Sequence, residues 1–197
     1  MPGYGAFAPA PAPRRRRRLW IILGAVAAAV IVILVAGIIG VTRFLNPVPP
    51  ATGATVSTAF VQLKVATGWS ESQTRGSELE LKNRGDGDML VGYGNAGQDG
   101  ISSDDSAFKN LQTNLIANFG GSVSQCVSTH GVLVGGKGGQ EEGFRYNFQG
   151  TDLCEIAWVD VVSSSRYYYW NIADDYSKLS TLQNSNAAMQ ETASWRV

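Results

Sequence analysis

Residues 19–41 form an uninterrupted apolar run, without any charged residue and without His, Asn, Gln or Pro. A helix of this length extends roughly 35 Å, which exceeds the ~30 Å hydrocarbon core of a bilayer. The alternative is a helix buried in a protein core, but such helices are seldom apolar on every side over this length. The sequence therefore predicts one transmembrane helix over residues 19–41.

The charges around this run predict how it is oriented. Residues 14–18 are five consecutive arginines directly before it, whereas Arg43 alone lies close behind it. Positive charge is retained on the cytoplasmic side, so we expect a cytoplasmic N-terminus and an extracytoplasmic C-terminal part at the cell membrane. A cleaved signal peptide would need a shorter apolar run and a small-residue cleavage site, which residues 41–45 do not offer, so we expect a retained signal-anchor.

The segments on either side of the apolar run have low-complexity compositions. Residues 1–18 are rich in Pro and Ala and then in Arg, which predicts a disordered cytoplasmic tail. Residues 42–56 contain three prolines and are predicted to form an extended stalk. The remainder, residues 57–197, has the length of one extracytoplasmic domain.

The formal net charge of zero hides an asymmetry along the chain. All 16 acidic residues follow the apolar run, whereas ten of the 16 basic residues lie from Lys64 onward, so the C-terminal part carries a charge of about −6. Phosphate backbones are bound chiefly by Lys and Arg. This balance predicts that nucleic acid is not a partner.

The chain contains two cysteines, Cys126 and Cys154, and both lie in the predicted outer domain. Oxidising compartments favour disulfides, so the predicted location favours a bond between them over two buried free thiols. Closing a loop of this size contributes roughly 3–4 kcal/mol to stability on the chain-entropy model.

Alternating apolar and polar residues predict several strands in the domain. Turn-forming residues separate them, as in the segment from Asn83 to Asp88 and in the three serines 163–165. The predicted strands lie around residues 61–65, 79–81, 89–91, 132–134, 144–148, 154–162 and 166–172.

Two segments instead have helical periodicity. The first begins at Ser102 or Ser103, has apolar residues from Phe108 to Phe119 at helical spacing, and ends at Gly120. The second is predicted to run from Asp174 or Asp175 to near Trp195. Strands joined by short turns and covered by two such helices predict an α+β fold, a mainly antiparallel sheet flanked by two helices and preceded by the transmembrane helix.

Four features follow one another in the domain: an early Gly-Trp pair, a hairpin, a helix, and a closing helix that leads to a Ser-aromatic end. They are Gly68-Trp69, the hairpin through Leu79 and Leu90, the helix with Leu111 and Leu115, and the helix around Met189 that leads to Ser194-Trp195. In these features the domain resembles the Mog1/PsbP-like family. The resemblance implies an antiparallel sheet sandwiched by helices in an extracytoplasmic, tethered protein. It implies no catalytic residues, because members act as assembly factors, binding modules or sensors.

Several short motifs resemble ligand sites, but none has the required context. The G-x-G-x-x-G of residues 92–97 is not followed at once by a helix, and residues 131–137 lack the Ser or Thr and the helix of a phosphate loop. The acidic groups near Asp88 and Asp99 lack the spacing of a calcium loop. His130 is the only histidine and is expected in a loop. We therefore predict no cofactor, no metal and no catalytic residues.

Residues 167–170, three tyrosines and a tryptophan, are the most distinctive aromatic stretch. On a strand, Tyr168 and Trp170 face one way while the two other tyrosines face the opposite way. One pair is expected in the core, and the second pair lies either under a helix or on an exposed aromatic surface. Together with Trp158, Tyr168 and Trp170 are candidates for contact with a glycan, a lipid or a protein partner.

The sequence thus predicts a single-pass membrane protein whose outer domain is not an enzyme and binds a partner protein or another component of the cell envelope. The alternative is a small-molecule or lipid sensor with a pocket between sheet and helix, lined by residues such as Phe144, Trp158 and Tyr168. An aromatic pocket of several hundred cubic ångströms would favour the alternative.

Overall fold

A computed structural model of the chain describes residues 51–85 and 87–197. The described residues form one compact unit. The predicted transmembrane helix, residues 19–41, the cytoplasmic tail and most of the stalk lie outside the described residues. Within the part of the chain that is described, no helix is both long and apolar enough to cross a bilayer.

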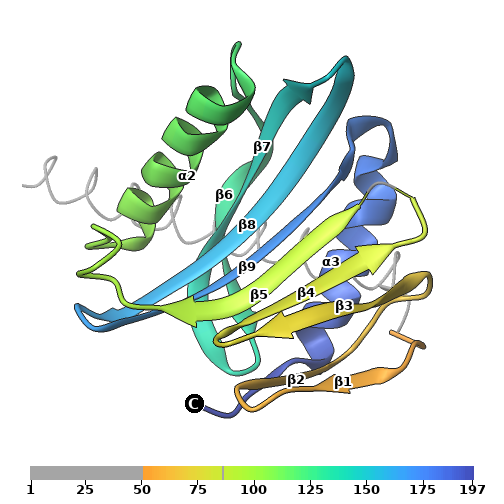
Figure 1. Ribbon diagram of the computed structural model, residues 1–197, viewed down its shortest axis with the longest axis vertical. Coiled ribbons are helices and arrows are strands. Elements are labelled where there is room, and N and C mark those ends of the chain that lie inside the picture. Colours follow the sequence, from red (N-terminus) through yellow and green to blue (C-terminus); the bar gives the residue numbers. More distant parts are fainter. Residues whose placement is uncertain (1–50, 86) are drawn as a thin grey trace, which may run out of the picture. The chain divides into compact units, whose positions relative to one another are not determined.

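A seven-stranded antiparallel sheet is the centre of the domain (Figure 1). Its strand order is β3-β4-β5-β9-β8-β7-β6, so that the two halves of the chain meet where β5 pairs with β9. The strands are β3 (Trp69–Arg75), β4 (Glu78–Asn83), β5 (Asp88–Gly94), β6 (Ser124–Val134), β7 (Lys137–Phe148), β8 (Thr151–Ser163) and β9 (Arg166–Asp175).

One helix, α2 (Asp104–Phe119), covers part of one face of this sheet. It begins as the sequence predicts, with Ser103 as N-cap in a reciprocal capping box with Ser106, and it ends at Gly120. The Asp104 carboxylate accepts a hydrogen bond from the Val161 backbone N–H at 2.9 Å and so fixes the start of α2 to β8. α2 packs on β7 and β8, and β5 and β9 are therefore only partly covered on this face.

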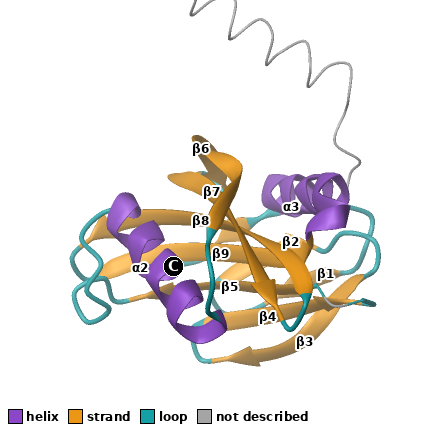
Figure 2. Ribbon diagram, turned by 90° about the horizontal axis from the view of Figure 1, so that it is seen from above, coloured by secondary structure: helices purple, strands orange, loops and turns teal. Residues whose placement is uncertain are grey.

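The opposite face is covered by α3 (Leu179–Thr192) together with a small second sheet. That sheet contains β1 (Thr55–Ser57), β2 (Val61–Lys64) and β10 (Ser194–Trp195), with β2 in the middle. A short 3-10 helix, η1 (Tyr176–Lys178), leads from β9 into α3. Figure 2 shows α2 and α3 on opposite sides of the large sheet.

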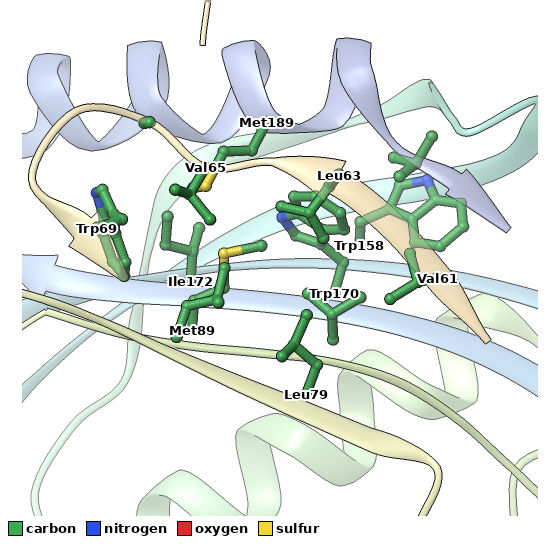
Figure 3. Close-up of a cluster of buried hydrophobic side chains, with 14 of the residues drawn as sticks. Val61, Leu63, Val65, Trp69, Leu79, Met89, Trp158, Trp170, Ile172 and Met189 are labelled. Carbon is green, nitrogen blue, oxygen red and sulfur yellow. The ribbon is translucent and has the colours of Figure 1, made fainter. Parts of the chain in front are cut away.

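The main core lies between the large sheet and the layer formed by α3 and β2. Leu63, Trp158, Trp170 and Met189 are at most 1% exposed there, and Figure 3 shows them facing one another. A second cluster under α2 includes Phe108, whose ring centroid lies 6.2 Å from that of Phe144. The fold is therefore a sandwich with a filled core on the α3 side.

The predicted disulfide is confirmed. Cys126 of β6 and Cys154 of β8 are bonded, with their Cα atoms 6.3 Å apart. Because β6 and β8 are the two neighbours of β7, the bond ties three adjacent strands together. It supports the expectation that the domain folds in an oxidising compartment.

Some predicted boundaries were wrong. Asp174 and Asp175 are the last residues of β9, and Trp195 belongs to β10, so that the closing helix is shorter than predicted. The apolar residues from Tyr176 onward have helical spacing, but this spacing does not show where the helix begins. The chain first completes β9 and then forms the 3-10 helix η1 before α3 starts at Leu179. Regular structure also begins before residue 57, because β1 includes two residues of the predicted stalk.

Candidate functional site

The three aromatic residues predicted as contacts lie in the main core. Trp158 and Trp170 are fully buried, and Tyr168 is 3% exposed. The Trp170 Nε1–H donates to Asn186 Oδ1 at 2.7 Å, and the Trp158 Nε1–H donates to the Val132 carbonyl at 3.1 Å. Of the two arrangements that the sequence left open, burial is the one observed for this face, so these side chains hold the layers together.

The polar motifs on this side of the sheet are structural. Glu141 accepts hydrogen bonds from Asn186 Nδ2 at 2.9 Å and from Gln190 Nε2 at 2.7 Å, which ties α3 to β7. His130 is part of β6 and not of a loop as predicted, and its Nε2 lies 3.6 Å from Glu141 Oε1. Gly135 and Gly136, both at positive φ, form the predicted hairpin turn between β6 and β7, whereas Gly131 lies within β6.

The G-x-G-x-x-G segment has a packing function. Gly92 and Gly94 lie on β5 directly opposite Tyr169 and Tyr167 of β9. A Cβ atom on Gly92 would lie 2.7 Å from the Tyr169 hydroxyl oxygen, and one on Gly94 would lie 2.5 Å from Tyr167 Cε1. The absence of side chains on β5 thus lets both tyrosine rings lie flat across it.

Two adjoining hollows follow the edge of α2 on the open part of the sheet, with volumes of about 600 Å³ and about 570 Å³. Leu90 of β5 and Asn171 of β9 line both hollows and form their common floor. We call the two hollows together the α2 groove. Their size lies within the range of ligand pockets in proteins, ~300–1,000 Å³.

An aromatic cluster closes the first hollow at the C-terminal end of α2. The Phe119 ring stacks on Tyr146, with 5.1 Å between centroids, and meets the edge of Phe148 at 5.0 Å. Phe119 and Phe148 are 38% and 40% exposed, so that both present apolar surface to the hollow and to solvent. Such clusters of partly exposed aromatic rings are typical of binding sites.

Glu155 lines the same hollow from the middle of β8. Burial among apolar neighbours raises the pKa of its carboxyl group to about 7, although the Tyr146 hydroxyl, 3.5 Å from Oε2, lowers it in part. Burial, with the neighbouring Glu155 charge, also raises the pKa of Tyr146 well above its ordinary value. The hollow therefore contains a carboxyl group that can gain or lose a proton near neutral pH.

The second hollow is lined by tyrosine–carboxylate pairs. The Tyr169 hydroxyl donates to Glu78 Oε2 at 2.7 Å, and the Tyr167 hydroxyl donates to Asp99 Oδ2 at 3.0 Å. Burial, followed by the contact with Asp99, raises the pKa of Tyr167 to about 12, and burial raises that of Tyr169 further. Both tyrosines are therefore neutral hydrogen-bond donors at physiological pH.

The predicted acidic groups act as local structural contacts. Asn83 accepts hydrogen bonds from the Gly85 and Gly87 backbone N–H groups, and Asp88 pairs with Lys82 at 3.4 Å. Among the described residues, no group of three or more His, Cys, Asp or Glu side chains could hold a metal ion. The α2 groove can thus bind an apolar body and orient its polar groups by hydrogen bonds.

No local pattern in the sequence identifies the residues of this groove. Glu155 is detectable as one charged residue inside the long apolar strand 153–159. The glycines opposite Tyr167 and Tyr169 were predicted as a glycine-rich strand end and loop, without a function in packing against tyrosines. The contacts of Phe119 with Tyr146 and Phe148 depend on where α2 lies on the sheet. The local periodicity of the sequence does not predict that position.

Comparison with solved structures supports the fold. The cyanobacterial PsbP (CyanoP) from Synechocystis has a TM-score of 0.52 and 11% identity over 76% of this chain and 96% of its own. LpqN, involved in cell envelope biogenesis of Mycobacterium tuberculosis, has a TM-score of 0.47 and 11% identity over 73% of this chain and 85% of its own.

A crystal structure from Bacteroides thetaiotaomicron has a TM-score of 0.47 and 12% identity over 74% of this chain. This chain covers 49% of that structure's length, about half of it. No protein-family model matches the chain, and no curated protein matches it. The similarity is therefore one of fold, and the described domain has the Mog1/PsbP-like fold that the sequence resemblance predicted.

Proposed function

We propose that this chain is a single-pass, membrane-anchored extracytoplasmic module that is not an enzyme and that binds an amphiphilic small molecule or lipid in the α2 groove. The observation that carries this proposal is the groove itself, about 600 Å³ and about 570 Å³, with partly exposed aromatic rings at one end. The filled core on the α3 side offers no comparable reason to place a ligand there.

The features of the groove match an amphiphilic ligand. Leu90, Leu153 and Phe119 provide apolar contact, whereas Asn171 and the tyrosine–carboxylate pairs provide hydrogen bonds. Ligand sites in proteins usually combine an apolar lining with few polar groups that fix orientation. A non-enzymatic function agrees with the lining of the groove, because the described residues there include no Ser, Cys, His or Lys and burial keeps the hydroxyl groups of Tyr167 and Tyr169 neutral.

The sequence and the disulfide support the proposed location in the cell. The apolar run 19–41 and the arginines before it favour an anchor with the domain outside, and the Cys126–Cys154 bond supports an oxidising compartment. A cysteine introduced at the exposed Gln98 tests this orientation in intact cells. We expect labelling by a membrane-impermeant maleimide without cell lysis, and labelling only after lysis would contradict the orientation.

A dye-binding experiment tests the groove. Nile red, a neutral dye whose emission increases in apolar surroundings, should brighten in the presence of the wild-type domain. The variant Leu90→Trp fills the common floor of the two hollows and should abolish the increase. Leu133→Trp is the matched control, because Leu133 is 73% exposed at the β6–β7 hairpin and lines neither hollow. Equal dye binding by both variants would refute the proposed site.

A protein partner is the second candidate, and one observation favours it. Ile116 is 46% exposed and lies three residues before Phe119 on α2, and Phe119 contacts Phe148, so partly exposed apolar side chains gather at this end of the helix. Apolar patches of this kind also occur at protein interfaces. A photo-crosslinking residue at position 116 of the full chain in its own membrane tests this candidate, and reproducible recovery of no crosslinked protein would eliminate it.

A further inference from the structure

The charges that line the α2 groove are all of one sign. Four carboxylates line the two hollows: Asp88 and Glu155 in the first, Glu78 and Asp99 in the second. Among the described residues that line either hollow, none is Lys, Arg or His. An anionic ligand head would therefore meet like charges inside a partly desolvated groove, which is unfavourable.

Most of these carboxylates are not neutralised by the protein. Within the described part of the chain, only Asp88 of the four forms an ion pair, with Lys82. Glu155, Glu78 and Asp99 are each approached by a tyrosine hydroxyl, which is a neutral donor. A carboxylate accepts up to about four hydrogen bonds, so each retains capacity for a ligand.

The aromatic cluster at the first hollow adds a second kind of attraction. Phe119, Tyr146 and Phe148 line the same hollow as Glu155, whose Oε2 lies 3.5 Å from the Tyr146 hydroxyl oxygen. The faces of aromatic rings attract cations, and the attraction increases when the cation is desolvated. A carboxylate next to aromatic rings is therefore complementary to an ammonium group with an apolar body attached.

We propose that the α2 groove selects a cationic amphiphile, with an amine or quaternary ammonium group beside Glu155 and the aromatic cluster and with its apolar body over Leu90. This inference rests on the proposed function and names the chemical class of its ligand. The inference depends on the complementarity of charge between the carboxylates and the ligand, because apolar contact alone would accept an alkyl chain with any head group.

Three decyl amphiphiles with different charges test the selection: decyltrimethylammonium, the net-neutral decyldimethylamine N-oxide, and decanoate. Residues 51–197 contain both core clusters and serve as the protein, in calorimetric titrations at pH 8 below the micelle concentrations. We expect the ammonium to bind about tenfold more tightly than the N-oxide, the effect of one charge-assisted contact, and decanoate to bind most weakly.

Two variants locate the effect. Glu155→Gln should reduce the preference for the ammonium to less than about twofold while N-oxide binding persists, since only the charge is removed. Glu191→Gln removes the same charge from an exposed position on α3 and should leave the preference unchanged.

The outcomes separate the two proposals. Binding of all three amphiphiles with equal affinity, tightest binding of decanoate, or an unchanged preference in Glu155→Gln would overturn the inference and leave the proposed function standing. Binding of none of the three, together with no Nile red response, would overturn the proposed function as well.

Discussion

Replacing Glu155 by Gln should stabilise the domain at neutral and alkaline pH. The folded domain raises the pKa of this carboxyl group from 4.5 to about 7, chiefly by burial. The glutamine side chain has nearly the same shape but no charge, so the variant removes the cost of holding an ionised group in the first hollow. The perturbation therefore isolates the charge from the packing.

The sign and size follow from proton linkage. Well below pH 4.5 the carboxyl is protonated in both states, and the charge costs nothing. As the pH rises through the interval between 4.5 and about 7, the unfolded chain ionises first, and the folded domain loses stability relative to it. The unfolding free energy of Glu155→Gln minus that of wild type should therefore increase by about 3 kcal/mol between these limits.

Urea unfolding of residues 51–197 at several pH values measures this difference, with fluorescence of the buried Trp158 and Trp170 as the signal. The comparison with wild type at each pH cancels the contributions of the other titrating groups. Glu191→Gln, at an exposed position, should show no such increase. A difference that stays constant with pH, or that falls as the pH rises, would refute the assignment of Glu155 as a destabilised buried carboxyl.

Three further perturbations test the packing. Gly94→Val should lower the unfolding free energy by about 1–3 kcal/mol in the urea experiment, because a Cβ at this position would lie 2.5 Å from Tyr167 Cε1. Gly131→Ala should lower it much less, because the space that its Cβ would enter is open. Reduction of the disulfide should add two hydrogen masses in intact mass spectrometry and lower stability by roughly 3–4 kcal/mol, and an unchanged mass would refute the bond. Asn186→Ala should cost about 1–3 kcal/mol, since it leaves Trp170 Nε1 without its acceptor, and an unchanged melting curve would contradict that contact.

Local patterns predicted the elements whose residues alternate or carry caps. Ser103 and Gly120 bound α2 as predicted, because capping depends on residues next to the helix ends. The compartment argument predicted the disulfide correctly. The alternation in residues 144–148 and 166–172 also predicted strands that are now β7 and β9.

The parts that were missed depend on contacts between distant segments. β3 is an edge strand in which five of its seven residues are exposed, so that it shows no alternation between apolar and polar residues. β10 has two residues and exists because it pairs with β2, more than a hundred positions earlier in the chain. Neither leaves a periodic signal that a single sequence could reveal.

The groove was missed for a similar reason. The sequence showed that Tyr168 and Trp170 face away from Tyr167 and Tyr169, but not which pair enters the filled core. The pairing of β5, β9 and β8 brings Glu155, Asn171 and Leu90 to one face of the sheet. The helix α2 covers β7 and β8 and leaves this part of the sheet open. The position of α2 on the sheet follows from the packing of Phe108 and Leu115 and not from any local motif.

The most direct test of the central claim is the position of a bound amphiphile on the domain. In NMR spectra of residues 51–197, titration with decyltrimethylammonium should shift the signals of Phe119, Tyr146, Phe148 and Leu90, which line the first hollow. The signals of Met189 and Leu63, in the core under α3, should stay in place. Shifts confined to the α3 side, or no shifts at saturating amphiphile below its micelle concentration, would contradict a binding site in the α2 groove.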